Sequence, residues 1–285
     1  MTTKIILSAD STCDLGDKLK DRYHVQYFPL HITLGGRLYT DNVDITPGET
    51  FEIYRKTGEL PKTSAVNVGE YLERFRQWTQ EGFEVIHVNL GSSISSSHEN
   101  AVQAAKQTGG VHVIDSGNLS SGSGLLVIAA AERIAQGMPA AQVALEVEEL
   151  REKTHASFII DTLEFLRAGG RCSTLQELTA NLLKIKPCIE VDNRDGSMRL
   201  GRKYRGKLES VLLRYTEDKL EEYVGQIDDS RVFITHTPIA AELIELVRDY
   251  LREKACFKEI LVTDASTTIS SHCGPSTLGV LFMTR

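Results

Sequence analysis

Residues 85–105 read Val85-Ile-His-Val-Asn-Leu-Gly-Ser-Ser-Ile-Ser-Ser-Ser-His-Glu-Asn-Ala-Val-Gln-Ala-Ala105, passing from a short apolar segment through five serines into an alanine-rich segment. This order predicts a β-strand, a polar loop and the first turns of a helix. Because the first N–H groups of a helix lack internal partners and the helix dipole adds partial positive charge, the loop suits a carboxylate or phosphate. The alternative is a plain helix cap, with Ser95, Ser96 or Ser97 as N-cap and Glu99 completing a capping box.

Strand-like and helical patterns alternate around this stretch. The predicted strands are Lys4–Leu7, a β-rich run Val25–Leu34 that contains Pro29 and precedes a Gly35-Gly36 turn, Phe83–Leu90 and Val111–Ile114. The predicted helices are Asp17–Tyr23, Pro47–Thr57, Val68–Trp78, an apolar buried helix at Gly122–Gln136, and Ala140–Lys153. Such alternation predicts a mainly parallel, three-layer α/β unit.

Polar residues follow three of these strands where each one ends. They are Asp10-Ser11-Thr12, Ser92–Ser97 and Asp115-Ser116. Because the carboxyl ends of parallel strands meet at one edge of a sheet, we expect these loops to lie close together.

The pattern changes from Phe158 onward. Strand-like pieces occur at Phe158–Asp161, Cys188–Asp192, Ser197–Leu200, Arg231–His236 and Glu259–Asp264, with helices predicted at Leu208–Val224 and Ile239–Lys254. Asn193-Arg-Asp-Gly196 is a hairpin signal, which introduces antiparallel pairing. We therefore expect an N-terminal α/β domain at residues 1–156 and a C-terminal mixed α+β domain at residues 157–285.

The composition of the 285-residue chain is ordinary for a globular protein, with 41% hydrophobic and 25% charged residues. The formal charge of −7 and the pI of about 5.7 argue against a nucleic-acid partner and against binding to an anionic membrane surface. An acidic residue interrupts the apolar N-terminal run, and no segment reaches membrane-spanning length, so we expect a cytoplasmic protein without stable membrane insertion.

Metal and disulfide chemistry have little support in the sequence. The five cysteines are dispersed, odd in number and without a Cys-x-x-Cys pair, and the eight histidines show no ligand spacing. We therefore expect reduced thiols, no metal and no cofactor.

Two further segments could bind an anion. Leu163–Arg171 predicts a short helix stopped by two glycines, which leaves Arg171 placed for bidentate contact with a carboxylate or phosphate. The alternative is a surface arginine paired with an acidic residue. His272 stands on a Gly-Pro turn amid hydroxyls and suits an anionic head group or acid–base chemistry, the alternative being a solvated loop histidine. A nucleophilic Cys273 beside His272 is disfavoured, because catalytic pairs are generally remote in sequence.

The ordered motifs resemble the DegV family along essentially the whole chain. They are Asp10-Ser-Thr-Cys-Asp-Leu15, Pro29-Leu30, Tyr39-x-Asp41 with Asp44-Ile-Thr46, Pro61-Lys-Thr-Ser64, Val113-Ile-Asp-Ser116, Gly122-x-Gly124, Leu163-x-Phe-Leu-x-x-Gly-Gly-Arg171, Ile185-Lys-Pro187, Lys203-x-Arg205-Gly and His272-x-Gly-Pro275. Each motif is weak alone, but chance does not readily produce ten in this order.

The resemblance implies a carrier that binds a long-chain fatty acid in a tunnel between or beside two domains. A separate ATP-dependent kinase subunit of a bacterial fatty acid kinase would phosphorylate the carboxylate in place, giving an acyl phosphate, so the carrier itself would have no catalytic residue. The sequence also lacks a phosphate-binding Gly-rich loop and a nucleophile elbow. The opposing hypothesis is a hydrolase or phosphotransferase that acts on a small anionic substrate through Asp10, Ser95 and His272.

Carried over by motif, Thr63 and Ser95 would be hydroxyl partners of the carboxylate, while Arg171 and His272 would steady the acyl phosphate. The serine loop departs from the family pattern, because Ser95-Ser-Ser-His98 stands where Ser-Gly-Thr-Tyr is usual. Ser93 and Ser96 are therefore further candidates for head-group contact, and Ser11, in the polar loop after the first predicted strand, is another. Cys273 and Ser276 also replace residues that are more often Thr and Gly, which could alter head-group contacts.

A sequestered tail agrees with the energetics of burial. At about 0.8 kcal/mol per buried CH₂, a long acyl chain contributes on the order of 10 kcal/mol. Apolar segments that could wall a tunnel are Gly124–Ala130, Phe158–Ile160 and Leu182–Ile185, although core packing is the usual role of such residues.

Overall fold

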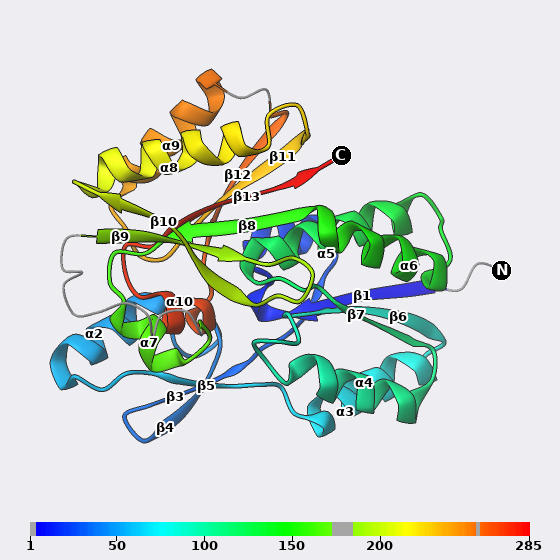
Figure 1. Cartoon of the computed structure of the whole chain (residues 1–285). Coiled ribbons are helices and arrows are strands. Elements are labelled where there is room, and N and C mark those ends of the chain that lie inside the picture. The colour runs from blue at the N-terminus through cyan, green and yellow to red at the C-terminus, as the bar shows by residue number, and fades with distance from the viewer. Residues whose placement is uncertain (1–3, 173–184, 255–256) are drawn as a thin grey trace.

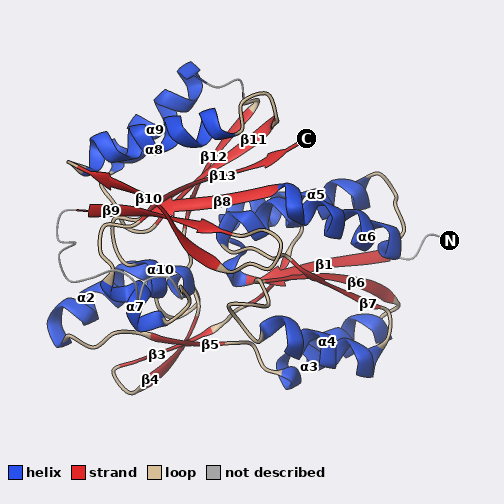
Figure 2. Ribbon diagram, in the orientation of Figure 1, coloured by secondary structure: helices blue, strands red, loops and turns tan. Residues whose placement is uncertain are grey.

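A computed structural model of the chain describes residues 4–172, 185–254 and 257–285. Its strands form a four-stranded, a six-stranded and a three-stranded sheet, with helices between and around them (Figures 1 and 2). The described chain therefore has a mixed α/β architecture.

The four-stranded sheet belongs to the N-terminal half and is parallel throughout. In spatial order its strands are β2 (Gln26–Phe28), β1 (Lys4–Asp10), β6 (Phe83–Asn89) and β7 (Val111–Asp115). Asn89 is in register with Asp115, so the carboxyl ends of β6 and β7 lie side by side. The predicted parallel sheet and the shared edge for its polar loops are confirmed.

The six-stranded sheet is mixed. Its strands, in spatial order, are β10 (Met198–Arg205), β9 (Ile185–Val191), β8 (Thr154–Ile159), β13 (Leu278–Thr284), β11 (Ile227–His236) and β12 (Glu259–Asp264). β11 and β12 pair in parallel, and the other neighbours are antiparallel. The predicted hairpin at residues 193–196 joins β9 to β10. The strand at β13 was not predicted from the sequence, because its run of apolar residues follows a loop-like Gly-Pro segment.

The helices complete the layers seen in Figure 1. The four-stranded sheet carries α3 (Val68–Gln80) and α4 (Ser97–Thr108) on one face, and α5 (Ser120–Ala135) and α6 (Ala140–Leu150) on the other. The six-stranded sheet carries α8 (Leu208–Glu222) and α9 (Ala241–Lys254). The three-layer prediction for the N-terminal half is thereby confirmed.

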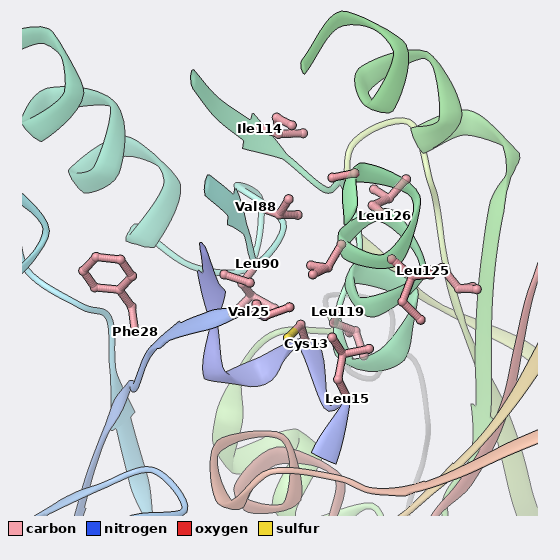
Figure 3. Close-up of a cluster of buried hydrophobic side chains, with 14 of the residues drawn as sticks. Cys13, Leu15, Val25, Phe28, Val88, Leu90, Ile114, Leu119, Leu125 and Leu126 are labelled. Atoms are coloured by element: carbon pink, nitrogen blue, oxygen red, sulfur yellow. The ribbon is translucent and has the colours of Figure 1, made fainter. Parts of the chain in front are cut away.

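Helix α5 is shared by the two large sheets, since it packs on β1 and β6 and also on β8 and β13. Figure 3 shows Leu125 and Leu126 of α5 in one apolar cluster with Val88 and Ile114 of the parallel sheet. A Cβ atom on Gly124 would lie 2.5 Å from the carbonyl oxygen of Cys13, so glycine permits the close approach of α5 to the loop after β1. Contacts on both sides explain why this helix is apolar all round.

The β-rich run at residues 25–34 is two strands, and the prediction of one continuous run was wrong. β2 ends before Pro29, and β3 (His31–Leu34) joins a separate sheet between β4 (Arg37–Thr40) and β5 (Lys62–Ser64). Proline lacks the N–H needed to continue a ladder, so the chain leaves one sheet there and enters another. The Gly35-Gly36 turn is confirmed, with both φ angles positive.

Shorter elements connect these layers. They are the 3-10 turns at Ser11–Cys13 and Arg151–Lys153 and the helices α1 (Gly16–Arg22), α2 (Pro47–Thr57), α7 (Glu164–Gly169) and α10 (Thr267–Cys273). The interpretation of His272 as a loop residue was wrong, because residues 267–273 form α10. A short run rich in Thr and Ser has little helical propensity of its own.

Two expectations are not settled by the fold. The predicted domain boundary after residue 156 falls inside β8, which pairs with β9 and β13 in the six-stranded sheet. The division into domains stays a prediction. Residues 182–184, predicted as a helix end and tunnel wall, lie outside the described residues. Within the described ranges, no helix is both long and apolar enough to cross a bilayer.

Candidate functional site

A cavity of about 270 Å³ lies where β5, α7, α10 and the loop after β6 meet. Its apolar lining comprises Leu30, Ala65, Leu90, Ile94, Leu119, Leu166, Met198 and Ile269, and its polar lining comprises Thr63, Ser64, Ser95, Ser96, Arg171, Thr268, His272 and Cys273. We call this the inner chamber. The predicted wall segments at residues 124–130 and 158–160 are absent from this lining and instead belong to the core.

A more open outer chamber of about 540 Å³ adjoins it. Ser95, Ser96 and Arg171 line both chambers and therefore stand at the boundary between them. The outer chamber adds Ser93 and Glu99, so its wall is more polar. An amphipathic ligand could thus place an apolar tail inside and an anionic head at the boundary.

The structure brings together four residues that the sequence singled out, Thr63, Ser95, Arg171 and His272, around the inner chamber. Among the further candidates, Ser96 lines both chambers and Ser93 lines the outer one. Ser11 lines neither. Its buried hydroxyl donates to Asp41 at 2.5 Å and accepts from the Leu30 backbone, so Ser11 supports the loop after β2.

Thr63 and His272 are in direct contact, with 2.8 Å between Thr63 Oγ1 and His272 Nε2. Nδ1 of His272 has no hydrogen-bond partner among the described residues. Desolvation, with a smaller contribution from the Arg171 charge, lowers the pKa of His272 to about 4. At neutral pH the imidazole therefore supplies hydrogen bonds and no charge.

Arg171 follows the short helix α7, which ends at Gly170 in the left-handed conformation, as predicted. Its guanidinium donates to the carbonyl oxygens of Gly169 at 2.6 Å and Ile94 at 3.4 Å. No carboxylate pairs with Arg171 among the described residues, which disfavours the surface ion pair considered for it. Its positive charge remains available to an anion.

The serine loop does not form the capping box that was considered as the alternative to an anion site. Ser96 is the N-cap of α4, and its side chain makes no capping hydrogen bond. The hydroxyl that caps the helix belongs instead to Ser95, whose Oγ accepts a hydrogen bond from the Ser97 backbone N–H at 3.2 Å. The Ser95 hydroxyl also donates to Ser97 Oγ at 3.0 Å.

Helix α10 carries His272 and is held by acceptors from the N-terminal half of the chain. Asp14 accepts from the Ser266 backbone at 2.9 Å, and Asp41 accepts from the Thr268 backbone at 3.0 Å. Both carboxyl groups are buried. They satisfy the free N–H groups of the first turn of α10 and so fix the site histidine.

Thr268 is a site residue that sequence reasoning missed. It lines the inner chamber, and its buried Oγ1 has no hydrogen-bond partner among the described residues. The available signal was the hydroxyl-rich run at residues 267–271, but only a helix places Thr268 one turn before His272. An unpartnered buried hydroxyl beside a cavity is suited to a polar ligand atom.

Nucleophilic and metal chemistry find little support in the site. Burial raises the pKa of Cys273 to about 12, so its thiol stays protonated and is a weak nucleophile. Among the residues that the structure describes, no group of three or more His, Cys, Asp or Glu side chains could hold a metal ion.

The family model of the DegV family, described as an uncharacterised protein family, matches residues 3–285. The chain belongs to the DegV family. Among its relatives, a DegV domain-containing protein of Staphylococcus aureus is 28% identical over 284 residues, covering 99% of this chain and 100% of the relative. One from Clostridium perfringens is 28% identical over 98% of this chain and 97% of the relative.

Solved DegV structures share the fold. A DegV family protein of Thermus thermophilus, described by its fatty acid binding, has a TM-score of 0.90 at 28% identity and covers 99% of this chain and 100% of its own. A DegV lipid binding protein of Thermotoga maritima gives 0.85 at 26%, covering 99% and 98%. A stearic acid-binding protein of Eubacterium ventriosum gives 0.82 at 25%, covering 97% of each chain.

Proposed function

We propose that this DegV family protein binds one long-chain fatty acid, with its tail in the inner chamber and its carboxyl group at the boundary between the chambers. The observation that carries this proposal is the lining itself. Eight apolar residues line the inner chamber together with Thr63 and His272, while Ser95 and Arg171 stand at its boundary with the outer chamber. The fatty acids named for the Thermus and Eubacterium relatives support the same ligand class.

The acyl tail and the head group would contribute to binding in different ways. Removal of the acyl chain from water provides most of the affinity, at about 0.8 kcal/mol per buried CH₂. Hydroxyls and the neutral imidazole orient the head group by hydrogen bonds. Arg171, which has no carboxylate partner among the described residues, lines the outer chamber, where it could bind the more negatively charged head group of an acyl phosphate.

We further propose that the protein is a carrier subunit that acts in the cytoplasm. A separate ATP-dependent kinase subunit would reach the carboxyl group through the outer chamber and convert it to an acyl phosphate. The absence of a nucleotide-binding loop motif from the sequence supports a division of labour between carrier and kinase.

Native mass spectrometry of the purified protein, before and after incubation with palmitic, stearic and oleic acids, tests the ligand. We expect one fatty acid per chain. Ile94→Trp, which places an indole at the chamber boundary, should reduce occupancy, whereas Leu145→Trp on the exposed face of α6 should not. A protein that remains empty with every fatty acid would contradict the proposal.

Incubation with ATP and a fatty acid kinase subunit, with hydroxylamine to trap acyl phosphate, tests the carrier role. Trapped product should require both proteins. If this protein alone sustained turnover of acyl phosphate or ester substrates, and Ser95→Ala abolished it, the stand-alone hydrolase or phosphotransferase would replace the carrier.

A further inference from the structure

Helix α10 carries four buried hydroxyl side chains, and three of them are satisfied within the protein. Thr267 Oγ1 donates to Asn42 Oδ1 at 2.8 Å. Ser270 and Ser271 donate to preceding backbone carbonyl oxygens at 3.3 and 2.7 Å. The fourth residue, Thr268, is only 3% exposed, and its Oγ1 has no hydrogen-bond partner among the described residues.

The Asp41 carboxylate lies beside Thr268 but does not satisfy this hydroxyl. Asp41 accepts from the Thr268 backbone N–H at 3.0 Å and from Ser11 Oγ at 2.5 Å. Burial raises the pKa of Asp41, and the Thr268 hydroxyl is among the groups that partly offset this effect, but its oxygen forms no hydrogen bond with the carboxylate. Because a buried polar group without a partner is costly, the Thr268 hydroxyl is suited to an atom that the protein itself does not supply.

Thr268 belongs to the apolar part of the inner chamber. It lines the inner chamber and not the outer one, whereas Arg171 lines both. Asp41 ties Thr268 to the lining residue Leu30, because the Asp41 N–H donates to the Leu30 carbonyl oxygen at 2.9 Å. Thr268 stands four residues before His272 in α10, which separates their backbones by about 6 Å along the helix axis. The Thr268 hydroxyl is therefore placed beside the first part of an acyl chain, beyond its head group.

The other unpartnered buried atom in this lining is not available in the same way. Within the described ranges, it is Nδ1 of His272. This atom packs against α7, since a Cβ atom on Gly169 would lie 2.2 Å from it. The opposite ring nitrogen, Nε2, is already bonded to Thr63 at 2.8 Å. Thr268 thus offers a buried hydroxyl to a ligand at a place where a plain hydrocarbon chain has nothing to bond to it.

We propose that the inner chamber takes a hydroxylated long-chain fatty acid, whose own hydroxyl group hydrogen-bonds to Thr268 Oγ1. The inference rests on the proposed function and names the substrate class of the same site. A ligand hydroxyl both donates and accepts, so it satisfies Thr268 in either sense. Four bonds join a carboxyl oxygen to a hydroxyl oxygen on carbon 3, and at about 1.5 Å each they span about 5 Å when extended. This span is close to the helical rise between His272 and Thr268, which favours a 3-hydroxy fatty acid.

Isothermal titration calorimetry with palmitic, 3-hydroxypalmitic and 16-hydroxypalmitic acids tests the position of the hydroxyl group. In the wild-type protein, 3-hydroxypalmitic acid should bind at least as tightly as palmitic acid. The 16-hydroxy acid should bind at least about tenfold more weakly, because its hydroxyl is buried at the far end of the tail without a partner.

Thr268→Val keeps the shape of the side chain and removes its hydroxyl. The affinity for 3-hydroxypalmitic acid should fall by about tenfold, the equivalent of one hydrogen bond. Palmitic acid should bind this variant more tightly, since a methyl group replaces an unpartnered hydroxyl beside its tail. Thr268→Ser retains the hydroxyl and should retain the preference for the 3-hydroxy acid, which keeps the proposal testable even if the valine variant fails to fold.

Ser270→Ala is the matched control, because Ser270 carries an equally buried hydroxyl in the same helix that is bonded within the protein and lines neither chamber. It should leave the ratio of the affinities for 3-hydroxypalmitic and palmitic acids unchanged.

The outcomes separate the two proposals. A wild-type protein that binds none of the three acids contradicts the proposed function itself. If the 3-hydroxy and 16-hydroxy acids bind the wild type equally, the Thr268 subsite is overturned and fatty-acid binding remains. If Thr268→Val weakens palmitic and 3-hydroxypalmitic acids to the same extent, Thr268 contacts the carboxyl group instead, and the subsite is again overturned.

Discussion

Arg171 keeps its charge available because its guanidinium bonds only to backbone carbonyls among the described residues. A carbonyl orients an arginine without neutralising it, whereas a carboxylate would do both. If the bound head group is phosphorylated as proposed, the side chain is already oriented for the anion that forms. We expect this residue to matter more for the phosphorylated head group than for the fatty acid.

The first prediction concerns Arg171→Ala. Affinity for palmitic acid, measured by isothermal titration calorimetry, should change little, because tail burial dominates binding. Acyl phosphate formation with a kinase subunit should fall by about 100-fold, as is usual when one preorganised donor to developing charge is lost. Arg171→Lys keeps the charge and should fall less. An equal loss of binding and phosphorylation would contradict this division of roles.

The second prediction concerns the protonation of His272. Its lowered pKa of about 4 has burial as the main cause and the Arg171 charge as a second cause. NMR of the imidazole should show a neutral ring from pH 8 down to pH 5. In Arg171→Ala the pKa should rise, because a nearby positive charge that disfavoured the imidazolium is gone. A pKa of His272 that falls or stays unchanged in Arg171→Ala would show that the Arg171 charge does not lower it.

The third prediction concerns Asp14, whose pKa burial raises from 3.8 to about 8 despite hydrogen bonds from Ser120 and Ser266. Between these values the folded protein holds a proton that the unfolded chain has released, so this group makes stability fall as pH rises. Asp14→Asn cannot ionise, and asparagine tolerates the left-handed backbone at this position.

Urea unfolding from pH 5 to pH 9 measures the effect. The wild type should lose at least about 1 kcal/mol relative to Asp14→Asn over this range. Asp17→Asn on the exposed surface of α1 is the control and should follow the wild type. Parallel curves for the wild type and Asp14→Asn would contradict the raised pKa.

At the scale of elements, the site depends on how α7 meets α10. A Cβ atom on Gly169, at the end of α7, would overlap Nδ1 of His272 on α10. The fourth prediction is that Gly169→Ala displaces the imidazole, breaks its bond to Thr63 and weakens fatty-acid binding by about tenfold, the equivalent of one or two hydrogen bonds.

Gly48→Ala is the matched control, because Gly48 lies in α2 with open space around its Cα and an ordinary φ angle. It should leave binding unchanged and slightly increase stability, since alanine has the higher helical propensity. Unchanged fatty-acid affinity in Gly169→Ala, measured by calorimetry, would show that the position of His272 is unimportant.

Elements with strong local signals were predictable. Pro47 begins α2 as expected, and Gly170 ends α7 in the conformation that glycine favours. The elements that were missed depend on distant partners. β5 is only three residues long and is stabilised by its pairing with β3. The first turn of α10 is stabilised by hydrogen bonds to Asp14 and Asp41, more than 220 residues away in the chain.

At the scale of the whole molecule, the inner chamber joins the two halves of the chain. Thr63 comes from the small sheet of the N-terminal half, and its partner His272 comes from the C-terminal half, 209 residues later. A ligand that contacts both should oppose their separation, and binding to the folded state alone raises stability by mass action.

The fifth prediction follows from that linkage. Palmitic acid at 100 times its dissociation constant should stabilise the protein by about 2.7 kcal/mol. This corresponds to a rise in Tm of about 5–10 °C by differential scanning fluorimetry. Octanoic acid at the same concentration should give almost no rise, because each missing CH₂ removes about 0.8 kcal/mol. Equal shifts from both acids would show that the tail is not buried.

The amino-acid sequence alone was sufficient for the parallel sheet and the alternation of its layers, and its family motifs singled out Thr63, Ser95, Arg171 and His272, which line one cavity in the structure while their head-group role stays a prediction. Hydrophobic periodicity, glycine stops and short motifs act over a few residues, so they can be read along the chain. The sequence also predicted the serine loop at a helix N-terminus, although Ser95 caps the helix without the capping box that was considered for it.

Tertiary contacts decided the rest. The helical state of residues 267–273 and the neutral His272 both depend on groups that folding brings from other parts of the chain. The wall of the inner chamber also escaped prediction, because a residue lines a cavity or fills the core according to what packs beside it. That choice is a property of the assembled layers, and no periodicity within a single segment encodes it.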